Sequence, residues 1–159
     1  MTTPPDQATA TAERLYDEAY KCLTTGDYPG FAALCAPSLV LNLRYAPKIS
    51  LDQLQQEAEN WRRGFVGYGQ APTQVTRFAS AGGNEFRNGA GTDMAAITQH
   101  FLVHSGPFRL PNGITIDATS REINVRVATF VHAIGGRIDR LNILLLNTDD
   151  FLAQMKPPS

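Results

Sequence analysis

The chain has 159 residues, of which 43% are apolar and 18% are charged, a composition typical of one ordinary globular domain with a buried core. Its 14 Lys and Arg residues balance 15 Asp and Glu residues, so the sequence lacks the basic excess of a nucleic-acid-binding protein. It contains no apolar run of the roughly 18 residues needed to span a membrane, and residues 1–7 do not resemble a secretory signal.

Two helices are predicted near the start of the chain. Residues 1–7 are polar and contain prolines, so we expect them to be disordered and a single domain to occupy residues 8–155. From Ala8 to Thr25 the apolar residues recur with the 3.6-residue period of an amphipathic helix. A glycine ends this helix, and Asp27 can cap a second, short helix that ends before Pro37.

The two cysteines, Cys22 and Cys35, fall on the apolar faces of these helices, where a free cysteine behaves as a small hydrophobic residue. They are too far apart for the Cys-x-x-Cys spacing of a redox or zinc site. Unpaired structural cysteines indicate a reducing compartment, and we expect a cytoplasmic protein.

A short strand over Leu39–Tyr45 and a third helix follow. Ser50 and Gln53 form the capping-box pattern that opens a helix. The apolar stripe of this helix consists of Leu51, Leu54, Ala58, Trp61 and Phe65.

The second half of the chain is predicted to form strands joined by glycine turns. Strands are expected over Thr73–Ser80, Thr92–His104 and Arg137–Asn147. Between the first two, Gly82-Gly83 predicts a bulge or bend and Asn88-Gly89 a hairpin turn.

The longest predicted strand is Ile114–Ala133, which is too long for a small flat sheet. It favours a strongly curved sheet whose concave side is closed by the helices into a cone. Such a cone is a pocket, and a small molecule is its simplest content. The fold class is therefore α+β.

Three local patterns are typical of one superfamily. They are Gly26-Asp27-Tyr28 between the first two helices, Ala36-Pro37-Ser38 before the first strand, and Gly136-Arg137-Ile138-Asp139-Arg140-Leu141 at the opening of the last strand. With the order of the elements, they make residues 10–150 resemble the SnoaL-like, or nuclear-transport-factor-2-like, superfamily.

This resemblance implies a cone-shaped, curved antiparallel sheet with three N-terminal helices packed on its concave face. The superfamily includes cofactor-independent enzymes similar to ketosteroid isomerase, scytalone dehydratase, limonene epoxide hydrolase and polyketide cyclases. It also includes non-enzymatic transport and assembly modules, so the fold alone does not give the function. Homodimers are common in it, and we expect one here.

Alternation along the longest strand separates two faces. One is β-branched and suits packing against helices or another subunit: Ile123, Val125, Val127, Thr129 and Val131. The other is mixed, as expected of either a pocket lining or a solvent-exposed surface: Glu122, Asn124, Arg126, Ala128, Phe130 and His132.

Glu122 on the mixed face is the first candidate for catalysis, because a carboxyl inside an apolar cone has a raised pKa and suits a general acid or base. Asn124 could donate a hydrogen bond to a substrate carbonyl or enolate, and Arg126 could bind substrate. The resemblance places Glu122 near the histidine of scytalone dehydratase-like enzymes. The alternative is a surface ion pair between Glu122 and Arg126.

His100, in the middle of the strand from Thr92, is the reserve acid or base. On the first helix, Tyr20 matches the placement of a tyrosine in scytalone dehydratase-like enzymes, and Tyr16 is a further candidate for substrate binding. Arg44 could bind a substrate oxygen anion. Leu43 lies near the position of the general base of ketosteroid isomerase-like enzymes, which disfavours a simple steroid-type double-bond shift.

Trp61, Phe101 and Phe130 are plausible apolar walls of the pocket or ordinary core residues. The three histidines have no close ligand spacing with a carboxylate, so no metal is expected, and no cofactor is implied. Epoxide hydrolysis is less favoured, because Asp93, Asp117 and Asp139 give no convincing Asp-Arg-Asp constellation.

The leading hypothesis is a cofactor-independent isomerase, cyclase or dehydratase of secondary metabolism. It would act by acid–base proton transfer on a polycyclic polyketide- or terpenoid-like small molecule. The alternative is a non-catalytic ligand-binding or protein-interaction module with the same fold.

Overall fold

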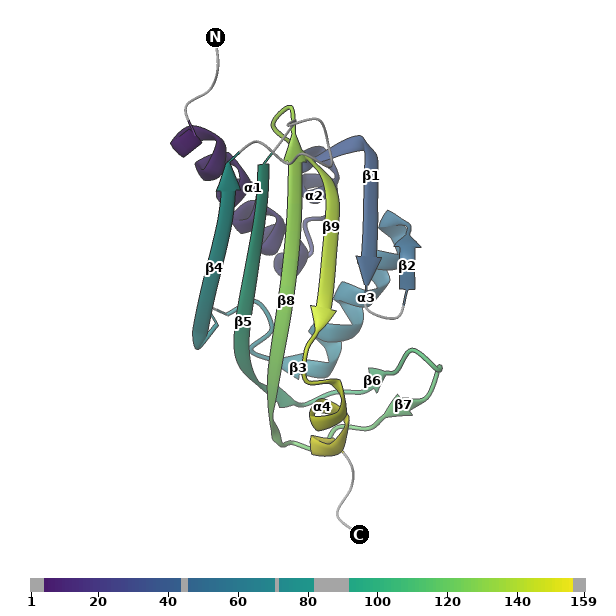
Figure 1. Ribbon diagram of the computed structural model, residues 1–159. Helices are drawn as coiled ribbons and strands as arrows, with labels where there is room; N and C mark the ends of the chain where they lie inside the picture. The colour runs from purple at the N-terminus through teal and green to yellow at the C-terminus, as the bar shows by residue number, and fades with distance from the viewer. Residues whose placement is uncertain (1–4, 44–45, 71, 82–91, 156–159) are drawn as a thin grey trace.

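In the computed structural model, which describes residues 5–43, 46–70, 72–81 and 92–155, the helices lie mainly before the long strands (Figure 1). The helices are α1 (Pro5–Thr25), α2 (Tyr28–Leu34), α3 (Leu51–Gly64) and the C-terminal α4 (Thr148–Gln154). None of them is long and apolar enough to cross a membrane.

The predicted helix starts are confirmed by their caps. The Asp27 side chain accepts the Gly30 N–H at the start of α2. At the start of α3, the Gln53 N–H donates to Ser50 Oγ at 3.1 Å and the Ser50 N–H donates to Gln53 Oε1 at 2.8 Å, which completes the capping box. Helix α1 begins at Pro5, inside the segment that was expected to be disordered. Proline is favourable in the first turn of a helix, since it has no N–H to leave unpaired there.

The strands form one large sheet and one small hairpin. They are β1 (Cys35–Leu43), β2 (Ala46–Ile49), β3 (Phe65–Val66), β4 (Gln74–Ala81), β5 (Thr92–His104), β6 (Phe108–Arg109), β7 (Thr115–Ile116), β8 (Glu122–Ile134) and β9 (Arg137–Leu145). The large sheet has the order β2-β1-β9-β8-β5-β3, with β4 also paired to β5. Its β1–β9 pair is parallel and its other pairs are antiparallel.

The prediction of one strand over Ile114–Ala133 is wrong. Its first part, β7, pairs with β6 in the small hairpin, and β8 begins only at Glu122. Between them Ser120 has a φ of 59°, which ends any extended run. The Ser120 N–H donates to the His104 carbonyl at 2.8 Å. The glycine and hairpin signals over residues 82–91 lie outside the described residues.

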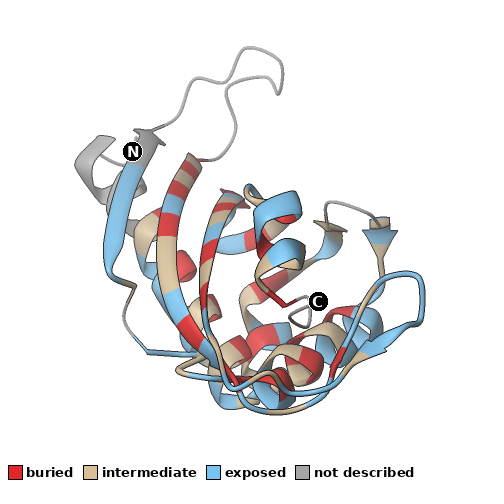
Figure 2. Cartoon of the chain, turned by 90° about the horizontal axis from the view of Figure 1, so that it is seen from below, coloured by how far each residue is buried: buried red, intermediate tan, exposed pale blue. Residues whose placement is uncertain are grey.

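The helices cover the concave face of the sheet, as expected (Figures 1 and 2). Helix α1 packs on β4, β5 and β8, while α3 contacts α1 and the β6 hairpin strand. Two apolar clusters fill the space between the layers, one around α1, α2 and β9 and the other around β3, the start of β8 and α4. The result is an α+β cone whose sheet is curved and not closed.

Burial along the strands decides which face of the sheet points inward (Figure 2). On β8, Ile123 is fully buried, whereas Phe130 is 43% exposed. On β5, the even-numbered residues face inward and Phe101 is 47% exposed. The register places His100 opposite Val125, which fixes the two inner faces relative to each other. The inner face of β8 is therefore the β-branched one. The mixed face is the outer one, on which Ala128 and His132 are nevertheless buried.

Candidate active site

A polar and aromatic group lies on the inner wall of the cone, between β5 and α1. The His100 ring stacks on the Tyr20 ring, with centroids 6.4 Å apart and planes 18° apart. His100 Nε2 is 3.0 Å from Thr98 Oγ1, and the Tyr20 hydroxyl donates to the Gln70 carbonyl at 3.0 Å. The Tyr16 ring also stacks on Tyr20, with centroids 6.5 Å apart.

Burial sets the charge of these two groups. It lowers the pKa of His100, because the interior disfavours the charged imidazolium. Burial also raises the pKa of Tyr20 to about 12, with a smaller contribution from Tyr16. At neutral pH the structure therefore offers a neutral imidazole, which can accept a proton, beside a phenol that can donate a hydrogen bond.

A second group lies on α3. The Trp61 Nε1–H donates to Glu57 Oε1 at 2.9 Å. Burial raises the pKa of Glu57, and the Trp61 hydrogen bond and the positive charge of Arg109 oppose that rise. The Trp61 ring also stacks on Tyr68, 6.4 Å away.

Tyr68 connects the two groups. Its pKa is raised first by burial and then by its electrostatic neighbours Tyr20, Tyr28 and Glu57. Tyr20 and Glu57, one from each group, therefore both act electrostatically on the Tyr68 hydroxyl. His100, Tyr20, Glu57, Trp61 and Tyr68 are only half-buried, so solvent reaches side chains that point between the layers.

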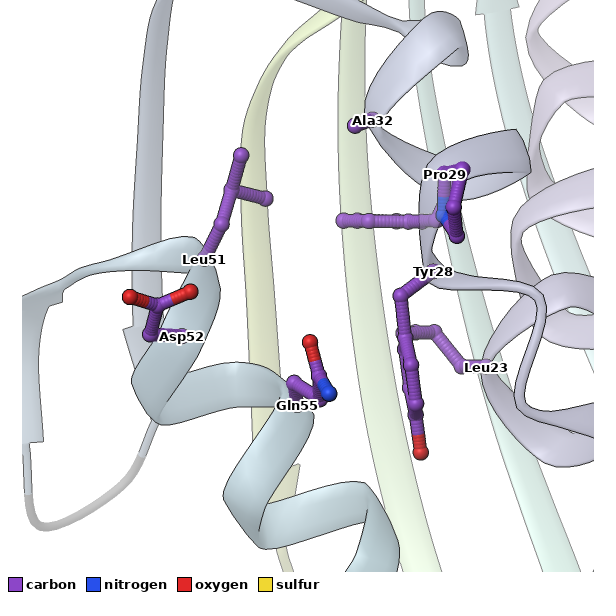
Figure 3. A pocket seen from close by; sticks show the side chains of 8 residues that line it. Leu23, Tyr28, Pro29, Ala32, Leu51, Asp52 and Gln55 are labelled. Atoms are coloured by element: carbon purple, nitrogen blue, oxygen red, sulfur yellow. The ribbon is translucent and has the colours of Figure 1, made fainter.

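A pocket of about 250 Å³ opens between α2 and α3, and its lining includes none of His100, Tyr20, Glu57, Trp61 and Tyr68 (Figure 3). Its apolar lining comes from Leu23, Tyr28, Pro29, Phe31, Ala32 and Leu51, and its polar lining from Asp52 and Gln55. Tyr28 belongs both to this pocket and to the electrostatic surroundings of Tyr68. The Tyr28 hydroxyl donates to Glu59 Oε1 at 2.5 Å, which ties α2 to α3.

The structure separates the sequence-predicted residues into two sets. His100, Tyr20 and Tyr16 come together on the inner wall, and Trp61 also lies on the inner side, packed against the second apolar cluster. The remaining described candidates, Glu122, Asn124, Arg126, Phe101 and Phe130, lie on the outer face of β5 and β8. Arg44 lies outside the described residues.

The outer position corrects the expected surroundings of Glu122. Its side chain is exposed on the outer surface and is not enclosed in an apolar cone. Asn124 is held by neighbours on the same surface, since the Gln99 amide donates to Asn124 Oδ1 at 2.9 Å. Alternation along the strand showed that Glu122, Asn124 and Arg126 share one face. Whether that face points into the cone or to solvent depends on which side of the sheet the helices pack against. Their roles in catalysis stay a prediction. The apolar interior that this prediction assumed around Glu122 is absent on the outer face.

Sequence reasoning missed Glu57 and Tyr68. Glu57 had a usable signal, because it lies one turn after Leu54 and one turn before Trp61, on the edge of the apolar stripe of α3. An acidic residue at such a position faces the interior more readily than its neighbours do. Tyr68 lies in a glycine-rich turn without periodicity, and no local pattern marks it. In the described part of the chain, no three His, Cys, Asp or Glu residues are grouped as metal ligands.

No protein-family model matches the sequence, and a search of curated proteins found no similar sequence. Solved structures do share its fold. A candidate polyketide cyclase from Xanthomonas campestris matches with a TM-score of 0.64 and 16% identity over 94% of this chain and 99% of its own. A candidate SnoaL-like polyketide cyclase from a Jannaschia species matches with a TM-score of 0.60 and 16% identity over 99% of both chains.

A nuclear-transport-factor-2-like protein from Burkholderia xenovorans matches with a TM-score of 0.58 and 10% identity, over 93% of this chain and 98% of its own. At these identities the likeness concerns the fold, and it confirms the resemblance first found in the turn motifs and the order of the elements. The chain has the cone fold of the SnoaL-like, nuclear-transport-factor-2-like superfamily.

Proposed function

We propose that the protein is an isomerase- or cyclase-type enzyme that moves a proton on a neutral, polycyclic, oxygenated small molecule. The observation that carries this proposal is the stack of His100 on Tyr20 inside the cone. A proton acceptor, the His100 imidazole, is thereby brought together with a hydrogen-bond donor, the Tyr20 hydroxyl, in a half-buried site.

In this mechanism the neutral His100 takes a proton from the carbon next to a substrate carbonyl. The Tyr20 hydroxyl, which donates to the Gln70 carbonyl in the unliganded protein, donates to the substrate oxygen as the enolate forms. Return of the proton to another carbon completes an isomerisation, and its transfer to a departing hydroxyl completes a dehydration. Glu57 serves as the second proton-transfer group.

The pocket between α2 and α3 would hold the apolar body of the substrate. A volume of about 250 Å³ exceeds that of an engineered cavity of roughly 150 Å³ that binds benzene, so a fused-ring system fits its size. Asp52 at the pocket would repel a carboxylate, which favours a neutral ligand. Polyketide- and terpenoid-like ring systems of secondary metabolism have this chemistry.

The proposal is tested with 2-tetralone, a neutral bicyclic ketone, by following exchange of its α-hydrogens for deuterium in D₂O by NMR. The protein should accelerate exchange, and His100→Gln and Tyr20→Phe should each lower the acceleration by about tenfold or more. Glu122→Gln distinguishes the two faces. If it abolishes exchange while His100→Gln does not, the outer residues carry the chemistry and the inner site is refuted.

A non-catalytic module is the second candidate. It is favoured by the outer face, where Ile97, Phe101, Val103 and Phe130 are exposed on neighbouring strands. Binding of 2-tetralone, seen as a change in Trp61 fluorescence, without any acceleration of exchange would support this candidate over the enzyme.

The same outer face supports a further part of the proposal, that the protein is a homodimer. Large apolar side chains exposed together on a sheet are typical of an interface.

Both cysteines, Cys22 and Cys35, are free thiols, which supports the proposed cytoplasmic location.

A further inference from the structure

The aromatic group on the inner wall of the cone is in contact with a cation that the proposed mechanism does not use. The guanidinium carbon of Arg77 lies over the Tyr16 ring, 5.3 Å from the ring centre. This is the geometry of a cation–π contact, in which the face of the ring attracts a positive charge. Tyr16 stacks on Tyr20, and Tyr20 stacks on His100. Two ring contacts therefore connect the cation to the proposed base.

The register of β4 explains why Arg77 points toward this group. Arg77 pairs with Ala96 of β5, and Ala96 is fully buried on the inner face of the sheet. Opposite residues of an antiparallel pair point to the same side of a sheet. Arg77 therefore points toward the helices, and α1 packs on both β4 and β5 (Figure 1).

Two carboxylates of α1 hold the guanidinium in place. Arg77 Nη2 and Nη1 lie 3.0 and 3.5 Å from the two carboxylate oxygens of Asp17, and Nη1 lies 3.9 Å from Glu13 Oε2. Glu13, Tyr16 and Asp17 have the i, i+3 and i+4 spacing of one helix face. A two-pronged contact with a carboxylate fixes the plane of a guanidinium, so the cation is fixed beside the neighbouring ring.

The consequence of these contacts is geometric more than energetic. The Arg77 and Asp17 side chains are 37% and 56% exposed, and ion pairs this exposed contribute little to stability. The Tyr20 ring, in contrast, needs a contact at its face. Its hydroxyl donates to the Gln70 carbonyl, but the hydroxyl lies on the axis about which the ring turns, so this bond does not fix the ring plane.

We propose that Arg77 is a positioning residue, which fixes the Tyr16 ring and through it the orientation of the Tyr20 ring against His100. The value of this orientation for catalysis rests on the proposed function, whereas the contacts themselves do not.

The first test needs no substrate and follows the ring C–H signals of His100 by NMR. The chain has three histidines, and the signals of His100 are those that His100→Gln removes. An aromatic ring shifts the signals of protons close to it, so Tyr20→Leu gives the size and direction of the shift on loss of the stack. Arg77→Gln should move the His100 signals part of the way in the same direction.

Arg14→Gln is the matched control. Arg14 forms an exposed ion pair with Glu18 on the same helix, also at 3.0 Å. It is two residues from Tyr16, and side chains at this spacing do not face each other, so the His100 signals should stay in place. Arg77→Lys keeps the cation but lacks the fork. It should give a smaller shift than Arg77→Gln, and it carries the test if Arg77→Gln does not fold.

The double variant with Arg77→Gln and Tyr16→Leu tests the route. It should shift the His100 signals no further than Tyr16→Leu alone, because both changes act through the same ring. In the 2-tetralone assay, loss of the cation–π contact in Arg77→Gln should lower the rate of exchange about two- to fivefold. Arg14→Gln should leave this rate unchanged.

Unmoved His100 signals in both Arg77 variants would overturn the proposal, as would additive shifts in the double variant. It would also be overturned if His100→Gln abolished exchange while Arg77→Gln left the rate unaltered. Signals that move as expected, in a natural protein that does not accelerate exchange, would support the positioning of the rings and refute only the proposed function.

Discussion

The assignment of the inner face of the sheet can be tested on two adjacent residues of β8. Ile123 has no exposed surface and packs in the cluster that also contains Phe65 and Phe151. Truncation to alanine removes buried methyl and methylene groups and leaves a cavity, which costs about 2–5 kcal/mol of unfolding free energy. For a chain of this size, that loss corresponds to a decrease in Tm of roughly 4–20 °C.

Glu122→Ala is the matched control, because this side chain precedes Ile123 and is exposed. Its effect should stay within about 0.5 kcal/mol. Urea denaturation followed by circular dichroism gives both values, with an unchanged slope m showing that the denatured state is the same. If Ile123→Ala were nearly neutral while Glu122→Ala clearly altered stability, the mixed face would be the buried one, and the inner placement of His100 would be wrong.

Three further predictions concern the helix cap, pH and assembly. Ser50→Ala should destabilise the protein by about 1 kcal/mol in urea denaturation, since it breaks the capping box of α3; no loss would contradict a formed cap. Because burial lowers the pKa of His100 below its ordinary 6.5, the unfolded chain binds this proton more readily. The free energy of unfolding should therefore fall as pH drops from about 6.5 through the folded-state pKa, and it should fall less steeply in His100→Gln. If the free energies of the two proteins fell in parallel with pH, His100 would not be buried as described. Phe101→Arg should shift a sedimenting dimer toward monomer without unfolding it, whereas a monomeric natural protein would contradict the dimer.

Local sequence signals were sufficient for most of the elements. The caps at Asp27 and Ser50 require only residues within one helical turn, and both helices begin there. The two glycines after β8 both have positive φ values, 60° for Gly135 and 76° for Gly136, which is the geometry of a tight hairpin turn. The break before β8 was missed, because Ser120 in a left-handed conformation has no distinctive sequence pattern.

The sequence by itself determined most of the elements and the sorting of strand residues into two faces, because helical and strand periods are properties of neighbouring residues. The cone was expected from the resemblance to the superfamily. It could not decide which face points inward. That depends on the packing of α1 and α3 and on the register that sets His100 opposite Val125. The stack of Tyr20 on His100 likewise joins segments far apart in the chain, and only tertiary packing brings them together.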